Sequence, residues 1–234
     1  MATFGGFPEE AMVFFRGLAR NNRREWFQAR KNIFEEKVKA PMIELVEAIN
    51  ADLAGFAPHY VTDPKKAIYR IYRDTRFSAD KTPYKTHIAA SFPHRGLVKH
   101  ACAGLYFSVS AKEIEVAGGV YMPGPDELLA IRRYLSDHHH QLRRIAGDRK
   151  LRSLMGELYG DALSRVPKGF PADHPAAGLL KMKQWLYYVI LDAGSATSPK
   201  LAGEIRKRLR ALIPFVEFLN CPLLARSKPV RPQC

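Results

Sequence analysis

The sequence has 234 residues, of which 47% are hydrophobic and 26% are charged, as is usual for a globular protein. It contains no apolar run of membrane-spanning length and no signal-peptide pattern, so no spanning helix is expected and a cytoplasmic location is predicted. Its formal net charge of +14 favours anionic partners such as nucleic acid, nucleotides or anionic lipid.

Three helices are predicted at the start of the chain, because apolar residues recur there at a spacing of three to four positions. Asn22, with Glu25 three positions later, is typical of the start of the second helix. The expected helices are residues 8–20, 23–39 and 42–53.

A sheet of about four strands is predicted next. Leu105, Phe107 and Val109 alternate with less apolar residues, as in a strand with one buried face. The link from Ser110 to Glu113 is short enough for a hairpin, which implies an antiparallel meander. The expected strands are residues 67–72, 86–92, 103–109 and 114–121.

The rest of the chain is predicted to be mainly helical, interrupted by a Pro- and Gly-rich loop at residues 165–178. Ser198 and Pro199 are typical of the start of a helix, which predicts a last helix over residues 198–220. The other expected helices are residues 126–137, 141–146 and 149–158, with residues 179–191 as helix and then strand.

These elements predict the α+β class: an antiparallel sheet of about four strands packed with N-terminal and C-terminal helices. We expect a single α+β domain over residues 4–221 and a loose basic tail over residues 222–234.

The positive charge is concentrated in two segments. Residues 61–100 hold nine basic and three acidic side chains, and residues 141–234 hold 17 and seven. The excess is typical of a surface that attracts anions, although a uniformly basic proteome would give the same count.

The block from Arg70 to Lys85 is the densest group of chemically capable side chains. Arginine forks bind carboxylate or phosphate at two points, so the block predicts an anion site, an internal ion-pair network, or both. Its cations are Arg70, Arg73, Arg76, Lys81 and Lys85, its carboxylates are Asp74 and Asp80, and its rings are Tyr72, Phe77 and Tyr84.

Two interpretations of this block compete. In the first, the five cations bind a phosphate or carboxylate, Asp74 and Asp80 orient the arginines or bind a metal, and Tyr84 contributes a hydroxyl. In the second, the block is a structural ion-pair network that needs further acids, because an unpaired buried charge is costly. The excess of cations over carboxylates favours the first. The further acids of the second would be Glu25, Glu35 or Glu36.

The histidines offer weaker signals. His174 follows Asp173 in the Pro-rich loop, where it would act as a general base or, as we prefer, anchor the loop by a hydrogen bond. The run from His138 to His140 points its side chains in different directions on a helix, so we predict a solvated helix end and no metal site. The catalytic candidates are therefore Asp74, Asp80 and His174.

The pattern Arg-x-x-Arg-Asp-x-Arg-Phe-x-x-Asp-Lys-x-x-Tyr resembles the signature of the domain-of-unknown-function 2461 family. The resemblance covers residues 4–221, implies the single-domain form of that family, and supplies no reaction. It rests on Arg70, Arg73, Asp74, Arg76, Phe77, Asp80, Lys81 and Tyr84.

The leading hypothesis is a phosphate- or anion-binding protein, whose ligand is a nucleotide, a phosphorylated metabolite or a nucleic-acid backbone. The alternatives are nonspecific nucleic-acid binding through the two basic segments, and a non-catalytic scaffold. The sequence leaves enzymatic activity, cofactors and oligomeric state open, and no membrane partner is expected. The expected anion-binding residues are Arg70, Arg73, Arg76, Lys81, Tyr84 and Lys85.

Overall fold

The computed structural model describes residues 4–99 and 101–227, and it confirms the α+β class. These residues fall into two compact units. Unit 1 contains residues up to Ser91 together with 106–116 and 190–207, and unit 2 contains 92–105, 117–189 and the residues from Arg208 onward. The single-domain expectation for residues 4–221 remains a prediction.

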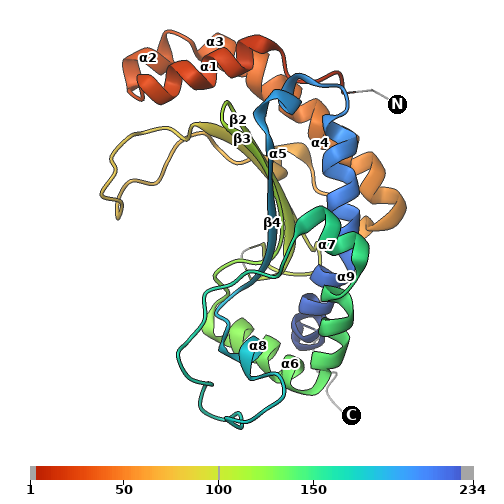
Figure 1. Ribbon diagram of the computed structural model, residues 1–234. Coiled ribbons are helices and arrows are strands. Elements are labelled where there is room, and N and C mark those ends of the chain that lie inside the picture. Colours follow the sequence, from red (N-terminus) through yellow and green to blue (C-terminus); the bar gives the residue numbers. More distant parts are fainter. Residues whose placement is uncertain (1–3, 100, 228–234) are drawn as a thin grey trace, which may run out of the picture. The chain divides into compact units, whose positions relative to one another are not determined.

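The N-terminal helices of unit 1, which Figure 1 shows, contribute rings to an aromatic cluster. The helical segments of this unit, apart from the start of the last helix, are α1 (Glu9–Arg20), α2 (Arg24–Gln28), α3 (Lys31–Ile33), the π-helical η1 (Phe34–Lys39), α4 (Ala40–Phe56), η2 (Pro58–Tyr60), α5 (Pro64–Ala67) and η3 (Ala193–Thr197). The Phe14 ring on α1 lies 5.6 to 6.2 Å from the rings of Trp26 and Phe27 on α2 and of Phe34 on η1.

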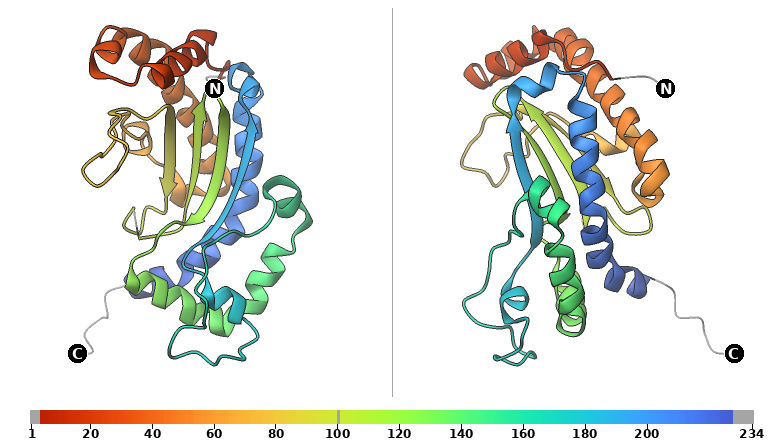
Figure 2. Two further views of the ribbon diagram at one scale, coloured as in Figure 1. Left: turned by 60° about the vertical axis from the view of Figure 1, so that its left-hand side comes forward. Right: turned by 45° about the vertical axis from the view of Figure 1, so that its right-hand side comes forward.

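The four-stranded antiparallel sheet that the sequence predicts is present, and its strand order is β1-β2-β3-β4. Each strand contains residues of both units, as does the last helix. In unit 1, α4 lies on one face of the strands, and no helix among the described residues of that unit runs along the opposite face (Figure 2). The strands are β1 (His87–Pro93), β2 (Gly104–Ser110), β3 (Glu113–Val120) and β4 (Trp185–Asp192).

In unit 2, a buried asparagine on the last helix is hydrogen-bonded to the segment just before β2. Asn220 is fully buried, and its side-chain amide bonds both the N–H and the C=O of Ala103 at 2.8 and 2.9 Å. These bonds satisfy two backbone groups just before β2 that have no strand partner. The helices with residues in this unit are α6 (Pro125–Ala146), α7 (Arg149–Met155), α8 (Ala177–Lys181) and α9 (Leu201–Ser227).

The predicted strand at residues 67–72 is wrong. The chain makes two isolated antiparallel bridges there, Ile68 with Ala90 and Tyr72 with Tyr84. The segment therefore changes partner between Ile68 and Tyr72, so no continuous ladder forms even though its residues favour strands.

The helical predictions need three further corrections. The predicted helix 23–39 is divided into α2, α3 and η1, because the chain leaves helical geometry at Arg30. Helix α6 is kinked at His138, where the predicted helices 126–137 and 141–146 meet, but His139 is buried although we predicted a solvated helix end. Helix α9 starts at Leu201 and includes residues 222–227 of the predicted tail, whose remainder lies outside the described residues.

Within the described part of the chain, no helix combines the length and the apolar character that crossing a bilayer requires.

Candidate functional site

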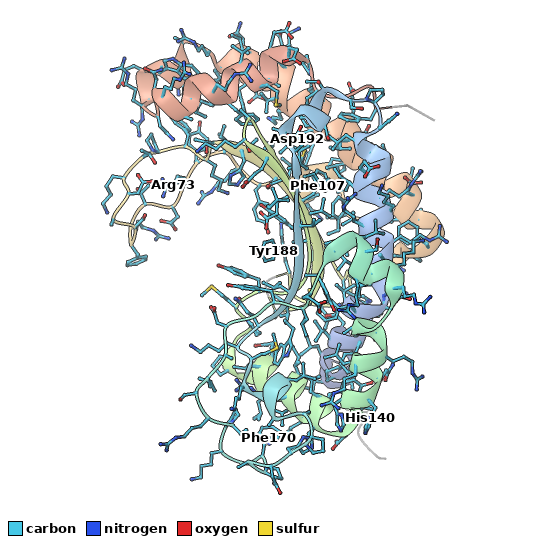
Figure 3. All side chains as sticks on the ribbon, in the orientation of Figure 1. Arg73, Phe107, His140, Phe170, Tyr188 and Asp192 are labelled. Atoms are coloured by element: carbon cyan, nitrogen blue, oxygen red, sulfur yellow. The ribbon has the colours of Figure 1, made fainter. Side chains whose placement is uncertain are left out.

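The motif block forms a loop closed by a short two-stranded ladder. The N–H of Arg73 donates to the C=O of Pro83 at 2.9 Å, and the N–H of Lys85 donates to the C=O of Ile71 at 2.8 Å. Figure 3 shows Arg73 in this loop, apart from Phe107 on β2. These hydrogen bonds close residues 74–82 into a loop, which we call the motif loop.

The base of the motif loop is fixed to the N-terminal helices. The Asn22 side chain donates to the C=O of Tyr84 at 2.8 Å and accepts from its N–H at 3.0 Å. The ring of Tyr84 is 2% exposed and stacks on Phe27, with 4.2 Å between centroids. Tyr84, expected in the anion site, is thus placed in the aromatic core.

The two carboxylates of the block pair with its arginines. Arg76 donates two hydrogen bonds to Asp74, from Nε at 3.0 Å and from Nη2 at 2.8 Å. Arg73 donates to Asp80 and to Thr82. The bonds from Arg76 and Arg73 lower the pKa of Asp74 and of Asp80, respectively, to about 2. Both carboxylates are therefore anions at neutral pH.

This pairing is common to both interpretations of the block, so an orienting role for Asp74 and Asp80 stays a prediction. The acids come from the loop itself and not from the N-terminal helices, where Glu35 instead pairs with Lys39 at 2.6 Å. The Arg76–Asp74 pair is exposed to solvent, with 76% and 45% of the two side chains accessible, whereas Arg73 is 26% and its partner Asp80 57% exposed. Exposed pairs of this kind stabilise a fold weakly.

The motif loop also carries an exposed aromatic ring. The Phe77 side chain is 95% exposed, and the Arg76 guanidinium carbon lies 5.8 Å from its ring centroid. Lys81 lies in the same loop and donates to the C=O of Thr75 at 2.9 Å. An apolar ring beside cations on a projecting loop is typical of a surface that contacts an anionic polymer.

Besides Lys81, whose hydrogen bond is to a backbone carbonyl, two cations of the block stand outside these ion pairs. The ammonium of Lys85 lies 5.2 Å from the centroid of the Tyr69 ring, and Lys85 is half-buried. Burial, and then the charge of Arg70, lower the pKa of Lys85. In the described parts of the chain, neither Arg70 nor Lys85 forms a salt bridge.

Lys85 leads onto one face of the sheet in unit 1. By strand alternation, the residues that share this face are His87, Ala89 and Ser91 on β1, Tyr106 and Ser108 on β2, and Glu113 and Glu115 on β3. The Tyr69 ring lies 6.4 Å from the Tyr106 ring. We use the name sheet-face cluster for Tyr69, Arg70, Lys85, His87, Tyr106, Glu113 and Glu115.

The environment of the sheet-face cluster favours the neutral form of several groups. Burial, then Lys85, lower the pKa of His87, while Glu113 opposes that shift. Burial, then Glu113, raise the pKa of Glu115. Burial also raises the pKa of Tyr106 to about 12, although its bond with Ser108 opposes this. Perturbed titratable groups gathered on one face are typical of functional sites.

The third catalytic candidate belongs to unit 2. His174 Nε2 lies 3.2 Å from the Ser136 hydroxyl, and His174 Nδ1 accepts from the N–H of Ala176 at 3.0 Å. With Arg143, which donates to the C=O of Pro175, these bonds attach the loop to α6. The arrangement matches the anchoring role; a catalytic role for His174 stays a prediction.

No metal site was predicted from the sequence. In residues 4–99 and 101–227, no group of three or more His, Cys, Asp or Glu side chains is placed to hold a metal ion.

The sequence prediction found Arg70 and Lys85 but missed most of the sheet-face cluster. Tyr106, Glu113 and Glu115 carried no motif spacing, and Tyr69 was assigned to a strand. The available signal was the alternation in β2 and β3, where the polar residues between buried ones must share the other face.

Comparison with known proteins agrees with the resemblance. A family model described as a conserved hypothetical protein (DUF2461) matches residues 10–218, which is most of the chain. No curated protein matches the chain.

Proposed function

The chain belongs to the DUF2461 family, and we propose that it binds a phosphate-bearing anion on the sheet-face cluster, with Arg70 and Lys85 as the cationic side. The family description names no reaction, so the proposal is argued from the chemistry of these residues.

The environment of Lys85 carries the proposal. A half-buried ammonium beside a guanidinium is disfavoured in its charged form, as the lowered pKa of Lys85 expresses. A bound anion would supply the missing negative charge and reverse that shift. Arg70 and Lys85 have no carboxylate in salt-bridge contact among the described residues, so they differ from Arg73 and Arg76.

The paired arginines take a secondary part in this proposal. Arg73 and Arg76 already donate hydrogen bonds to Asp80 and Asp74, so fewer of their N–H groups are available to an external anion. We therefore assign the ion-pair network of the scaffold hypothesis to the motif loop. We assign the anion site to Arg70 and Lys85 at the base of that loop.

Thermal unfolding with inorganic phosphate tests the proposal. Phosphate at about tenfold its dissociation constant should stabilise the wild-type protein by about 1.4 kcal/mol. For a chain of this length the melting temperature should rise by about 3–6 °C. Lys85→Met should lose most of this rise and keep the melting temperature of the free protein, because its apolar stem is retained.

Two matched variants serve as controls. Lys65→Met removes the same charge from an exposed site in α5 and should leave the phosphate response unchanged. Arg76→Ala removes a motif cation that is already paired and should also leave it unchanged. Loss of the response in Arg76→Ala but not in Lys85→Met would move the site to the motif loop, and no response in the wild type would refute the proposal.

Nonspecific binding of single-stranded nucleic acid is the second candidate, favoured by the exposed Phe77 ring beside Arg76. A cytoplasmic location belongs to the same proposal, since nucleotides and nucleic acid are found there. Cofactor use and catalysis are left open.

A further inference from the structure

We propose that the anion carries a planar ring with hydrogen-bond donors, as the base of a mononucleotide does, and that the ring lies on Tyr69 and Tyr106 with Glu113 and Glu115 beyond it. This inference rests on the proposed function, because it assigns the rest of the ligand whose phosphate Arg70 and Lys85 would bind.

The aromatic side chains adjoin the cationic side of the cluster. Lys85 Nζ is 5.2 Å from the Tyr69 ring, whose centroid is 6.4 Å from that of Tyr106. Both rings are half-buried, so each keeps part of its surface accessible. Sites that bind a nucleotide through its phosphate and its base combine a cation with such stacking rings.

The acidic side chains indicate that the ligand extends beyond its anionic group. Glu113 and Glu115 share the face of His87 and Tyr106 by strand alternation, and their charges act on the pKa of His87 and of Tyr106, respectively. Carboxylates would repel a small anion that approached them, but they accept hydrogen bonds from amino groups of a base. Cations on one side and carboxyls on the other therefore fit a ligand with an anionic end and a donor end.

The residues between the two sides are small. Ala89 and Ser108 share the face by alternation, and they are 3% and 7% exposed. Ser91 lies on the same face, and its buried hydroxyl has no hydrogen-bond partner among the described residues. Because Ala89, Ser108 and the Ser91 hydroxyl are buried, a planar ligand would lie on the rings of Tyr69 and Tyr106 and not on the strands themselves.

Calorimetric titration with inorganic phosphate, ribose 5-phosphate and the four common ribonucleoside monophosphates tests the inference. At least one nucleotide should bind about 10- to 100-fold more tightly than ribose 5-phosphate, which has the phosphate and sugar without the base. Tyr106→Leu and Glu115→Gln should remove most of this gain while phosphate binding persists, and Lys85→Met should weaken both.

Matched controls separate site effects from folding. Glu36→Gln changes an exposed glutamate on η1, and Tyr121→Leu changes a tyrosine that is 66% exposed, so neither should alter the gain. If Tyr106→Leu fails to fold, the nearly isosteric Glu115→Gln decides. Equal binding of every nucleotide and ribose 5-phosphate would overturn the inference and leave the proposed function standing. Failure of every phosphate compound to bind would overturn both.

Discussion

His139 shows how one residue makes the stability of unit 2 depend on pH. It is 5% exposed, and its Nδ1 has no hydrogen-bond partner among the described residues. The groups that act on its charge are His140 and Arg143 on α6 and His174 on the facing loop, all of them basic. Burial, followed by these neighbours, lowers the pKa of His139.

The sign of the effect follows from proton binding. In the unfolded chain a histidine has a pKa of about 6.5, so the unfolded state takes up a proton at a higher pH than the folded state does. The free energy of unfolding should therefore decrease as the pH falls below about 6.5. His139→Leu should remove this contribution, so its melting temperature should fall less than that of the wild type between pH 8 and pH 5.

The control for this series is His59→Gln, which changes an exposed histidine. Its melting temperature should follow that of the wild type over the same pH range. Parallel curves for His139→Leu and the wild type would show that His139 stays uncharged, or is solvated, throughout.

At the scale of elements, the contact of β3 with β4 depends on a glycine. Gly119 has φ +133°, and a Cβ placed there would lie 2.1 Å from the C=O oxygen of Trp185. Gly156, after α7, also has a positive φ, at +75°, but a Cβ there would meet no atom within 4 Å. The pair separates steric overlap between strands from backbone strain alone.

Gly119→Ala should destabilise the protein by about 3 kcal/mol or more, because strain and overlap add. Gly156→Ala should cost only about 1–2 kcal/mol, since strain acts alone. Chemical denaturation of the two variants measures the difference, and equal losses would mean that β4 can move away from β3 at little cost.

The elements also show what local sequence determines. The alternation of Leu105, Phe107 and Val109 located β2 to within one residue, because burial on one face imposes a period of two. The strand predicted at residues 67–72 failed because Ile68 and Tyr72 pair with different segments, and partner choice is a tertiary property. For the same reason, the spacing of residues in the sequence revealed the motif but not the sheet-face cluster. Glu115 comes near Tyr106 only because β2 and β3 pair.

At the scale of the whole molecule, the net charge of +14 has a measurable consequence for the second candidate function. The logarithm of the binding constant for a single-stranded oligonucleotide should fall linearly with the logarithm of the salt concentration. The slope is set by the number of phosphates contacted. Phe77→Ala should weaken binding by about 1–3 kcal/mol without changing that slope, because stacking releases no counterions.

Fluorescence anisotropy over a series of salt concentrations measures both quantities. Val98→Ala, which truncates another exposed apolar side chain, should bind like the wild type. No binding at low salt would exclude this function for the chain, and an unchanged affinity of Phe77→Ala would exclude a stacking role for the loop.

The interleaving of the two units bears on synthesis at the ribosome. Unit 1 begins within the first 91 residues but is complete only when residues 190–207 are available. At about 5–20 residues per second, translating the 98 residues from 92 to 189 takes roughly 5–20 s. During that interval the nascent chain would display a sheet edge on β3 that β4 has yet to cover. We expect the nascent chain to require chaperones most during this interval. Slow codons before residue 190 should lengthen the interval.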